Sequence, residues 1–104
     1  MDGNYILIGQ TAVEEPDLLK WAKWFEENQE TRIVKQTTIP GGLWLSTVFL
    51  GLDYRYGGGP PLLFETMLFR DGEGDECWRD CTWLEAEARH RSVLESLGVT
   101  EPAE

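Results

Sequence analysis

The spacing of apolar and polar residues changes from segment to segment along the chain, and it predicts the order of strands and helices. A short apolar run at residues 5–8 lies between Gly3 and Gly9. Short apolar runs bounded by glycine are typical of strands, so we expect a strand here. Residues 10–15, which follow, are expected to form a loop.

The next segment has the spacing of an amphipathic helix. From Leu18 to Phe25, apolar residues recur every three or four positions, while charged residues fall largely on the other side. Pro16 suits the first helical position, where no N–H donor is needed, and Asp17 favours the positive end of the helix dipole. The helix is expected to end near residues 28–30.

Three longer segments are rich in β-branched and aromatic residues and predict strands at 31–39, 43–51 and 62–70. The sequence Pro-Gly-Gly at 40–42 predicts a hairpin between the first two. The strand at 43–51 carries apolar side chains on both faces. We therefore expect either a central strand, or a strand with a helix over one face and loops or a partner over part of the other.

The last part of the chain predicts a turn, a short strand and a helix. The acidic residues 71–76 are expected to form the turn, and residues 77–80 a short last strand. Thr82 and Glu85 have the spacing of a capping box, in which each side chain bonds to the other's backbone N–H. We therefore expect a helix from Trp83 to about Leu97.

The resulting order is β-α-β-β-β-(β)-α. Consecutive strands joined by short connections favour an antiparallel sheet, so the sequence predicts an α+β fold in two layers. The sheet should contain three to five strands, together with two amphipathic helices. A chain of 104 residues fits one domain, which we place at residues 1–98, with a flexible tail at 99–104.

The net charge of −10 is concentrated at the two ends of the chain. Residues 1–30 carry −5 and residues 71–104 carry −7, whereas residues 31–70 carry +2. No basic patch is available for nucleic-acid phosphates or for an anionic membrane, so neither is an expected partner. The acidic ends are consistent with a protein partner that has a basic surface, although solubility alone is the favoured explanation of the charge.

The chain shows no signal for export or for membrane insertion. Its N-terminus lacks a basic region and a cleavage site, and no apolar run approaches the length of a membrane helix. We therefore expect a cytoplasmic protein.

The chemistry-bearing residues predict no catalytic site, metal site or cofactor. Cys77 and Cys81 lie four residues apart, but a zinc site would need two more ligands, and His90 is the one histidine. We expect His90 to be a structural core residue. The acidic run at 71–76 begins like a calcium loop but lacks the required glycine and glutamate further on. Gly57–Gly59 lack the Lys-Ser/Thr ending of a phosphate loop.

An interface is the alternative to catalysis, because tryptophan and tyrosine are enriched at binding hot spots. Five tryptophans are unusual for a chain of this length. The connection after residue 52 also carries four side chains that a plain turn does not require. The candidate interface residues are Asp53, Tyr54, Arg55, Tyr56, Trp24 and Trp44.

The segments STVFLGLD and GGGPPLLFETM, with their flanking residues, resemble a family of small uncharacterised proteins of bacteriophages and prophages. The resemblance spans almost the whole chain and brings no catalytic residues and no cofactor. It implies an accessory protein in the cytoplasm of an infected or lysogenic bacterium. Such a protein would act as a non-catalytic binding module for a host or phage protein, including as an inhibitor of a host defence system.

Two other functions stay open on the sequence. One is a virion or assembly component, for which a homo-oligomer would be expected. The other is a small enzyme with a pocket near residues 53–56 and Glu65, where an Asp, an Arg and two Tyr could bind a polar ligand. The absence of a catalytic motif favours the binding module over the enzyme.

Overall fold

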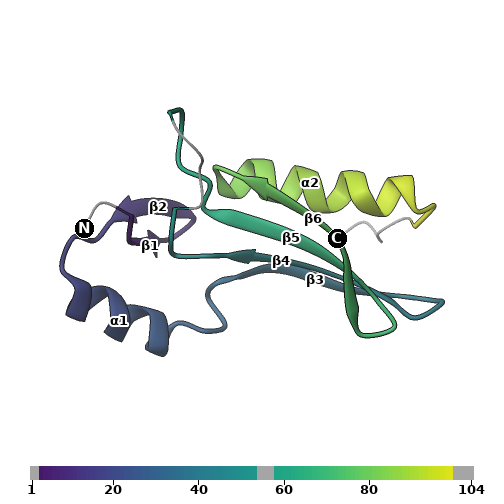
Figure 1. Ribbon diagram of the computed structural model, residues 1–104, viewed down its shortest axis with the longest axis horizontal. Coiled ribbons are helices and arrows are strands. Elements are labelled where there is room, and N and C mark those ends of the chain that lie inside the picture. Colours follow the sequence, from purple (N-terminus) through teal and green to yellow (C-terminus); the bar gives the residue numbers. More distant parts are fainter. Residues whose placement is uncertain (1–2, 54–57, 100–104) are drawn as a thin grey trace.

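The structure is a computed structural model that describes residues 3–53 and 58–99 (Figure 1). Its strands and helices are, in chain order, β1 (Tyr5–Ile8), β2 (Thr11–Glu14), α1 (Leu18–Glu27), β3 (Ile33–Ile39), β4 (Leu43–Phe49), β5 (Phe64–Arg70), β6 (Glu73–Asp80) and α2 (Trp83–Ser96). The fold is α+β with antiparallel strands, which confirms the class predicted from the sequence.

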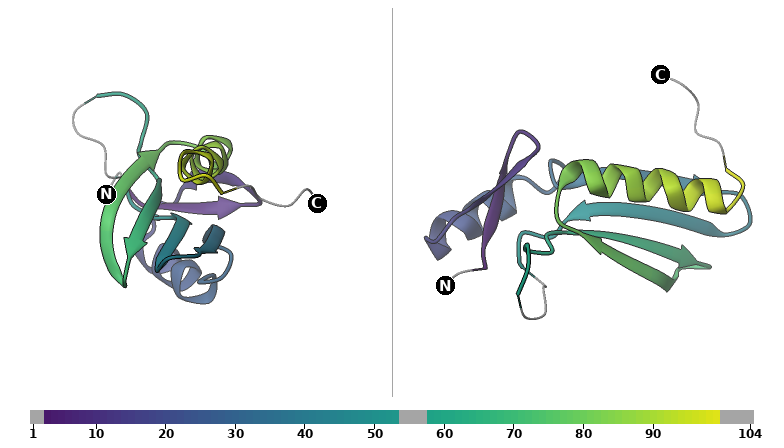
Figure 2. Two further views of the ribbon diagram at one scale, coloured as in Figure 1. Left: turned by 90° about the vertical axis from the view of Figure 1, so that its right-hand side faces the viewer. Right: turned by 90° about the horizontal axis from the view of Figure 1, so that it is seen from above.

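The strands form two separate sheets. Strands β3 to β6 pair in sequence order as a four-stranded antiparallel sheet, and β1 pairs with β2 as a two-stranded hairpin. The helix α2 lies along one face of the large sheet and contacts all four of its strands (Figure 2). The helix α1 packs against β1 at one end of the molecule (Figure 1). The large sheet therefore has one face covered by a helix.

The core lies between α2 and the large sheet. Alternation along β4 and β5 places every second side chain on the face toward α2, where Leu45 pairs with Leu68 and Phe49 pairs with Phe64. These four side chains are buried almost completely. Each contributes about 1.5–3 kcal/mol by leaving water.

Buried polar residues also lie in this core, and they bond to one another. His90 of α2 is 1% exposed. Its Nε2 lies 2.9 Å from the hydroxyl of Thr37, and its Nδ1 lies 2.8 Å from the hydroxyl of Thr47. Thr47 in turn lies 2.8 Å from Thr66. Both ring nitrogens are bonded inside the core, which confirms the prediction that His90 is a structural residue.

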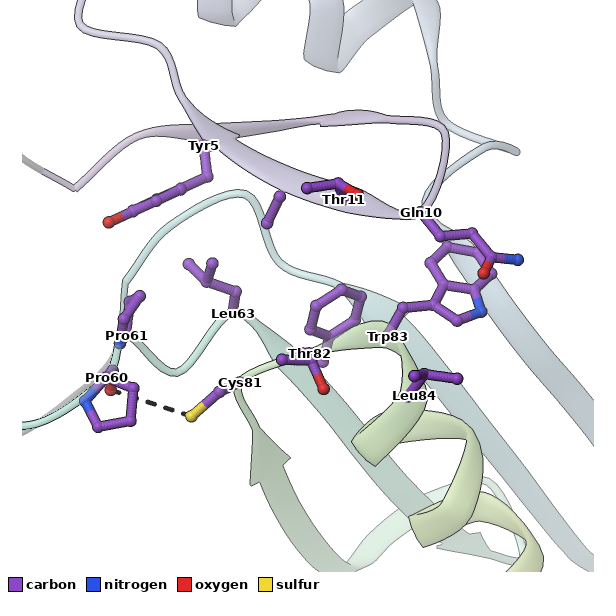
Figure 3. Close-up of a pocket in the computed structure, with 12 residues that line it drawn as sticks. Tyr5, Gln10, Thr11, Pro60, Pro61, Leu63, Cys81, Thr82, Trp83 and Leu84 are labelled. Atoms are coloured by element: carbon purple, nitrogen blue, oxygen red, sulfur yellow. Dashed lines mark hydrogen bonds between the residues drawn. The ribbon is translucent and has the colours of Figure 1, made fainter.

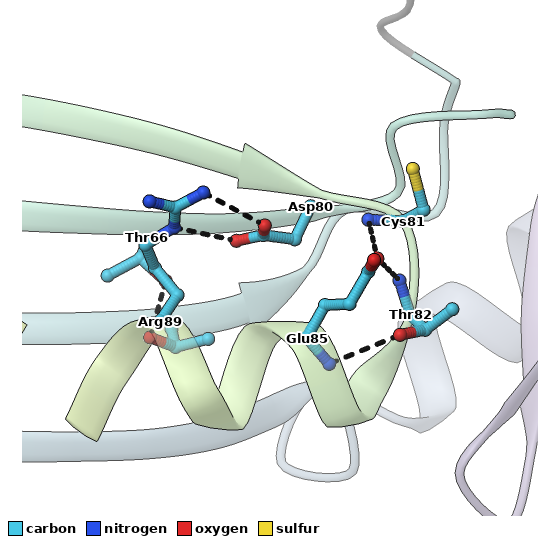
Figure 4. Close-up of polar contacts among 7 residues, drawn as sticks. Thr66, Asp80, Cys81, Thr82, Glu85 and Arg89 are labelled. Atoms are coloured by element: carbon cyan, nitrogen blue, oxygen red, sulfur yellow. Dashed lines mark hydrogen bonds and ion pairs between the residues drawn. The ribbon is translucent and has the colours of Figure 1, made fainter. Parts of the chain in front are cut away.

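The predicted capping box at the start of α2 is confirmed (Figure 4). The Glu85 N–H donates to the Thr82 hydroxyl at 3.1 Å, and the Thr82 N–H donates to the Glu85 carboxylate at 3.1 Å. One turn later, Arg89 donates two hydrogen bonds to Asp80 at the end of β6, each 3.2 Å long. These contacts fix the first half of α2 to the strand that precedes it.

The expected loop at residues 10–15 is wrong, because Thr11–Glu14 form strand β2. Ile8 pairs with Thr11, so the hairpin turns through Gly9 and Gln10 alone. Gly9 has a φ of 63°, and glycine at the first central position of a two-residue turn permits this tight reversal.

The start of α1 also differs from the prediction. The helix begins at Leu18 instead of Pro16, and Asp17 is its N-cap residue. The Asp17 carboxylate accepts hydrogen bonds from the N–H groups of Leu19 and Lys20, at 3.0 and 3.2 Å. Asp17 therefore stabilises the start of α1 by direct hydrogen bonds to its N–H groups, in addition to the favourable position of its charge at the positive end of the helix dipole.

The predicted turn at residues 71–76 is too long. Arg70 pairs directly with Glu73, so the turn consists of Asp71 and Gly72, which both have positive φ. An Asp-Gly pair is a strong hairpin signal in its own right, and it places Glu73 at the start of β6. The other predicted strands differ at their ends only, with β3 starting at Ile33, β4 ending at Phe49 and β5 starting at Phe64.

The end of the described chain is held against the core. The Val99 N–H donates to the Leu94 carbonyl at 2.9 Å, and its side chain packs on the cluster around Leu68 and Val93. The rest of the predicted tail lies outside the described residues. Within the described ranges, no helix has the length and apolar content needed to cross a membrane.

Candidate functional site: the open face of the sheet

The face of the large sheet that points away from α2 is the candidate functional site. We call it the open face, because α2 packs on the opposite side and α1 packs against β1. Its side chains come from alternate positions of all four strands, as the pairing register shows. The open face consists of Ile33, Gln36, Thr38, Trp44, Ser46, Val48, Glu65, Met67, Phe69, Cys77 and Arg79.

An aromatic pair dominates one end of the open face. Trp44 of β4 and Phe69 of β5 are cross-strand partners, and their ring centroids lie 5.0 Å apart at an interplanar angle of 30°. Trp44 is 37% exposed. A tryptophan stacked on a second ring presents a rigid apolar surface to solvent, which is typical of a binding hot spot.

An acidic hairpin tip flanks this pair. The turn and first residues of β6 carry four exposed acids, which are Asp71, Glu73, Asp75 and Glu76. Phe69 pairs with Gly74 of this tip, so the acids begin one strand away from the aromatic rings. Arg70 forms an exposed ion pair with Asp75, with 3.4 Å between Nε and Oδ2. The register pairs Glu73 with Arg70 and Glu76 with Leu68, on the α2 side of the sheet, so the acidic tip adjoins the aromatic end of the open face and its acids are spread over both sides of the sheet edge.

The other end of the open face carries an ion pair and a thiol. Arg79 donates from Nε and Nη2 to one carboxylate oxygen of Glu65, at 3.2 Å each. The Cys77 thiol donates to the same oxygen, with 3.3 Å between sulfur and oxygen. Partial burial and the hydrogen bond to Glu65 raise the pKa of Cys77, so this thiol stays neutral at pH 7. A neutral thiol is a poor nucleophile.

The middle of the open face is uncharged. Gln36 donates from Nε2 to the hydroxyl of Ser46 at 3.1 Å, and Met67 lies between Ser46 and Cys77 in the register. A Cβ at position 74 would lie 3.5 Å from the sulfur of Met67, which is an ordinary van der Waals distance. This part of the open face offers apolar and hydrogen-bonding surface.

The structure places the sequence-predicted site residues at different positions. Trp44 lies on the open face. Trp24 packs edge-on against Phe49 in the core, with 5.9 Å between ring centroids and an angle of 89°. Trp44 and Phe49 are at opposite ends of β4, so the two tryptophans do not share one surface.

The 53–56 segment is described only at its first residue. The Asp53 carboxylate accepts a hydrogen bond from the Leu62 N–H at 3.1 Å, and the Asp53 N–H donates to the Gly3 carbonyl at 2.9 Å. Asp53 therefore holds the two ends of the connection together. Tyr54, Arg55 and Tyr56 lie outside the described residues.

Phe69 and the acidic tip were missed as site residues in the sequence. The sequence does contain signals for both features. Phe69 alternates with core residues in β5, which places it on the face away from the core, and Asp-Gly marks a tight turn. Their proximity to Trp44 depends on the β4–β5 register, which residues 50–63 leave undefined in the sequence.

The described part of the chain contains no cluster of three or more His, Cys, Asp or Glu side chains placed to hold a metal ion. Cys77 and Cys81 are both free thiols. Comparison with protein-family models, with curated proteins and with solved structures gives no match to this chain.

Proposed function

We propose that this chain is a non-catalytic binding module that docks through the aromatic end of its open face on a protein with a basic surface. The single observation that carries the proposal is the stacked pair of Trp44 and Phe69 beside the acidic hairpin tip. An apolar centre with a charged border is the usual anatomy of a protein interface.

The charge of the border specifies the kind of partner. The four acids within residues 71–76 lie at the exposed edge of the sheet, so a partner that covers the aromatic pair and this edge is favoured by arginine and lysine side chains. Trp44 adds a ring face on which an arginine could stack. The resemblance to phage proteins supports a partner from the host or the phage, including a component of a host defence system.

Affinity capture from a bacterial lysate tests the proposal when it includes matched variants. Trp44→Ala removes the exposed ring of the open face, and Leu19→Ala removes an exposed apolar side chain of α1 as a control. The proposal requires a partner that the wild type and Leu19→Ala capture and Trp44→Ala does not. A hot-spot tryptophan contributes about 2 kcal/mol or more to binding.

The captured partner must then be purified and its affinity measured at increasing salt. Weaker binding at high salt is expected for an acidic border against a basic surface. A partner that binds Trp44→Ala as well as the wild type would overturn the proposal. Concentration-dependent self-association in sedimentation, abolished by Trp44→Ala, would instead support the assembly component.

A further inference from the structure

A hollow of about 500 Å³ is lined by residues of the β1–β2 hairpin, of the segment before β5 and of the start of α2 (Figure 3). Phe64 at the start of β5 lines it, whereas the aromatic pair is at the other end of that strand. The β1–β2 hairpin forms one wall and the first turn of α2 forms another. The segment that leads into β5 forms the third. The hollow exists because the hairpin is a separate sheet, which meets the large sheet through a few core side chains such as Leu7.

The walls of this hollow are apolar. Tyr5 and Ala12 come from the hairpin, Leu63 from the segment before β5, and Trp83 and Leu84 from α2. Leu84 is 74% exposed at the rim. Aromatic and aliphatic walls of this kind, with a volume between about 300 and 1,000 Å³, are typical of small-molecule sites.

Among the described residues, no charged side chain lines the hollow, although 27% of the chain is charged. Its polar groups are few. The Gln10 amide and the Thr11 hydroxyl lie at the hairpin turn, and the Cys81 thiol lies beside Pro60 (Figure 3). The Thr82 hydroxyl is already engaged in the capping box. The other polar atoms of lining side chains are the Tyr5 hydroxyl and the Trp83 indole nitrogen, which is buried and has no hydrogen-bond partner among the described residues. A charged ligand would find no counter-charge among these described lining residues, and burying it unpaired would be costly.

We infer that the hollow is a binding site for a small, neutral, mostly apolar molecule whose one polar group bonds to Gln10 or Thr11. The uncharged lining selects neutral compounds, and the hairpin turn supplies the hydrogen-bonding groups at one end. This inference does not depend on the proposed protein partner, because the hollow and the aromatic pair are at opposite ends of the sheet.

A matched pair of probes tests the selection for neutral compounds. At about pH 7, 4-butylphenol is neutral and 4-butylbenzoate is an anion of similar shape. Each is titrated into the ¹⁵N-labelled chain while backbone amide shifts are followed. We expect the phenol to saturate and to shift the amides of Ala12, Leu63 and Trp83. The affinity for the benzoate should be lower than that for the phenol by a factor of about ten or more.

Variants locate the site. Ala12→Phe places a ring in the hollow and should weaken phenol binding by about tenfold or more. Leu19→Phe, at an 82% exposed position on α1, should leave binding unchanged. Should Ala12→Phe fail to fold, Gln10→Ala tests the polar end, and the shift map of the wild type decides the location by itself.

Three results would overturn the inference. One is no saturable binding of the phenol up to its solubility limit. Another is equal affinity for the phenol and the benzoate. The third is a set of shifted amides centred on Trp44 and Phe69 instead of on the hollow.

Discussion

His90 of α2 and Thr47 of β4 are hydrogen-bonded in the core, with 2.8 Å between Nδ1 and the hydroxyl oxygen. Through Thr37 on β3 and Thr66 on β5, the same cluster reaches the two strands that flank β4. One imidazole therefore connects the helix to three neighbouring strands. Because buried polar groups need partners, removal of one member leaves the others unsatisfied.

The first prediction is that Thr47→Val destabilises the fold by about 1–3 kcal/mol. The change keeps the shape of the side chain but removes the hydroxyl shared by His90 and Thr66. The free energy of unfolding in urea measures the effect. Thr38→Val, at an exposed position of β3, is the control and should change stability by less than about 0.5 kcal/mol. Equal free energies of unfolding for the two variants would show that the Thr47 hydroxyl contributes no net stability.

The second prediction concerns the capping box of α2. Thr82→Ala should lower the free energy of unfolding by about 1 kcal/mol, because the Glu85 N–H loses its acceptor. Glu85→Ala should also destabilise, since its carboxylate accepts from the N–H groups of both Cys81 and Thr82. The double variant should lose less free energy of unfolding than the two single variants lose together, because the two side chains form one reciprocal cap. Simple additivity in a double-mutant cycle would contradict this interpretation.

The capping box also shows which parts of the structure can be predicted from sequence. Thr82 and Glu85 are three residues apart, so local spacing alone determines the contact. The same holds for the alternation of strands β4 and β5, which places Leu45 and Phe49 on one face. Local patterns therefore predict the α+β class and most of the elements.

Contacts between distant segments could not be predicted in this way. The pairing of Trp44 with Phe69 depends on a register across a long connection, and turn geometry defines registers only for short hairpins. The separate β1–β2 sheet was missed because Thr11–Glu14 carry few apolar residues. The candidate loop residue Asp53 bonds to Leu62, nine positions away. No local spacing in the sequence indicates that contact.

The third prediction concerns the two hairpin tips of the large sheet, which lie at the same end of the molecule (Figure 1). The Asp71 N–H donates to the Gly42 carbonyl at 2.8 Å. A Cβ at Gly42 would collide with the Asp71 carboxylate, whereas a Cβ at Gly41 would meet no atom within 4 Å. Both glycines have positive φ, so each change to alanine costs about 1 kcal/mol or more in backbone strain.

Gly42→Ala should therefore destabilise more than Gly41→Ala, by about 1 kcal/mol or less, because the colliding atom is the end of the exposed Asp71 side chain and can turn away. Thermal and urea unfolding of the two variants provide the comparison. The extra loss should disappear in an Asp71→Gly background, where the colliding carboxylate is absent and the positive φ of residue 71 is still accommodated. If Gly42→Ala still destabilises more than Gly41→Ala in that background, the Asp71 carboxylate is not the cause of the extra loss.

The last prediction concerns the reactivity of Cys77 on the open face. Burial and the hydrogen bond to Glu65 raise its pKa above the ordinary value of 9.0, while the nearby Arg79 acts in the opposite direction. In a Cys81→Ser background, iodoacetamide should therefore alkylate Cys77 more slowly than a free thiol at the same pH. The pH profile of the alkylation rate should have its midpoint above 9.0.

Two variants of the ion pair test the cause of this shift, because their effects have opposite signs. Glu65→Gln removes the negative charge beside the thiol, so the midpoint should fall. Arg79→Gln removes the cation that favours the thiolate, so the midpoint should rise. The folded state holds the thiol proton more tightly than the unfolded state. Stability from this group is therefore complete below pH 9.0 and is lost as pH rises through the folded pKa. An unchanged profile in Glu65→Gln would show that the carboxylate does not control the thiol.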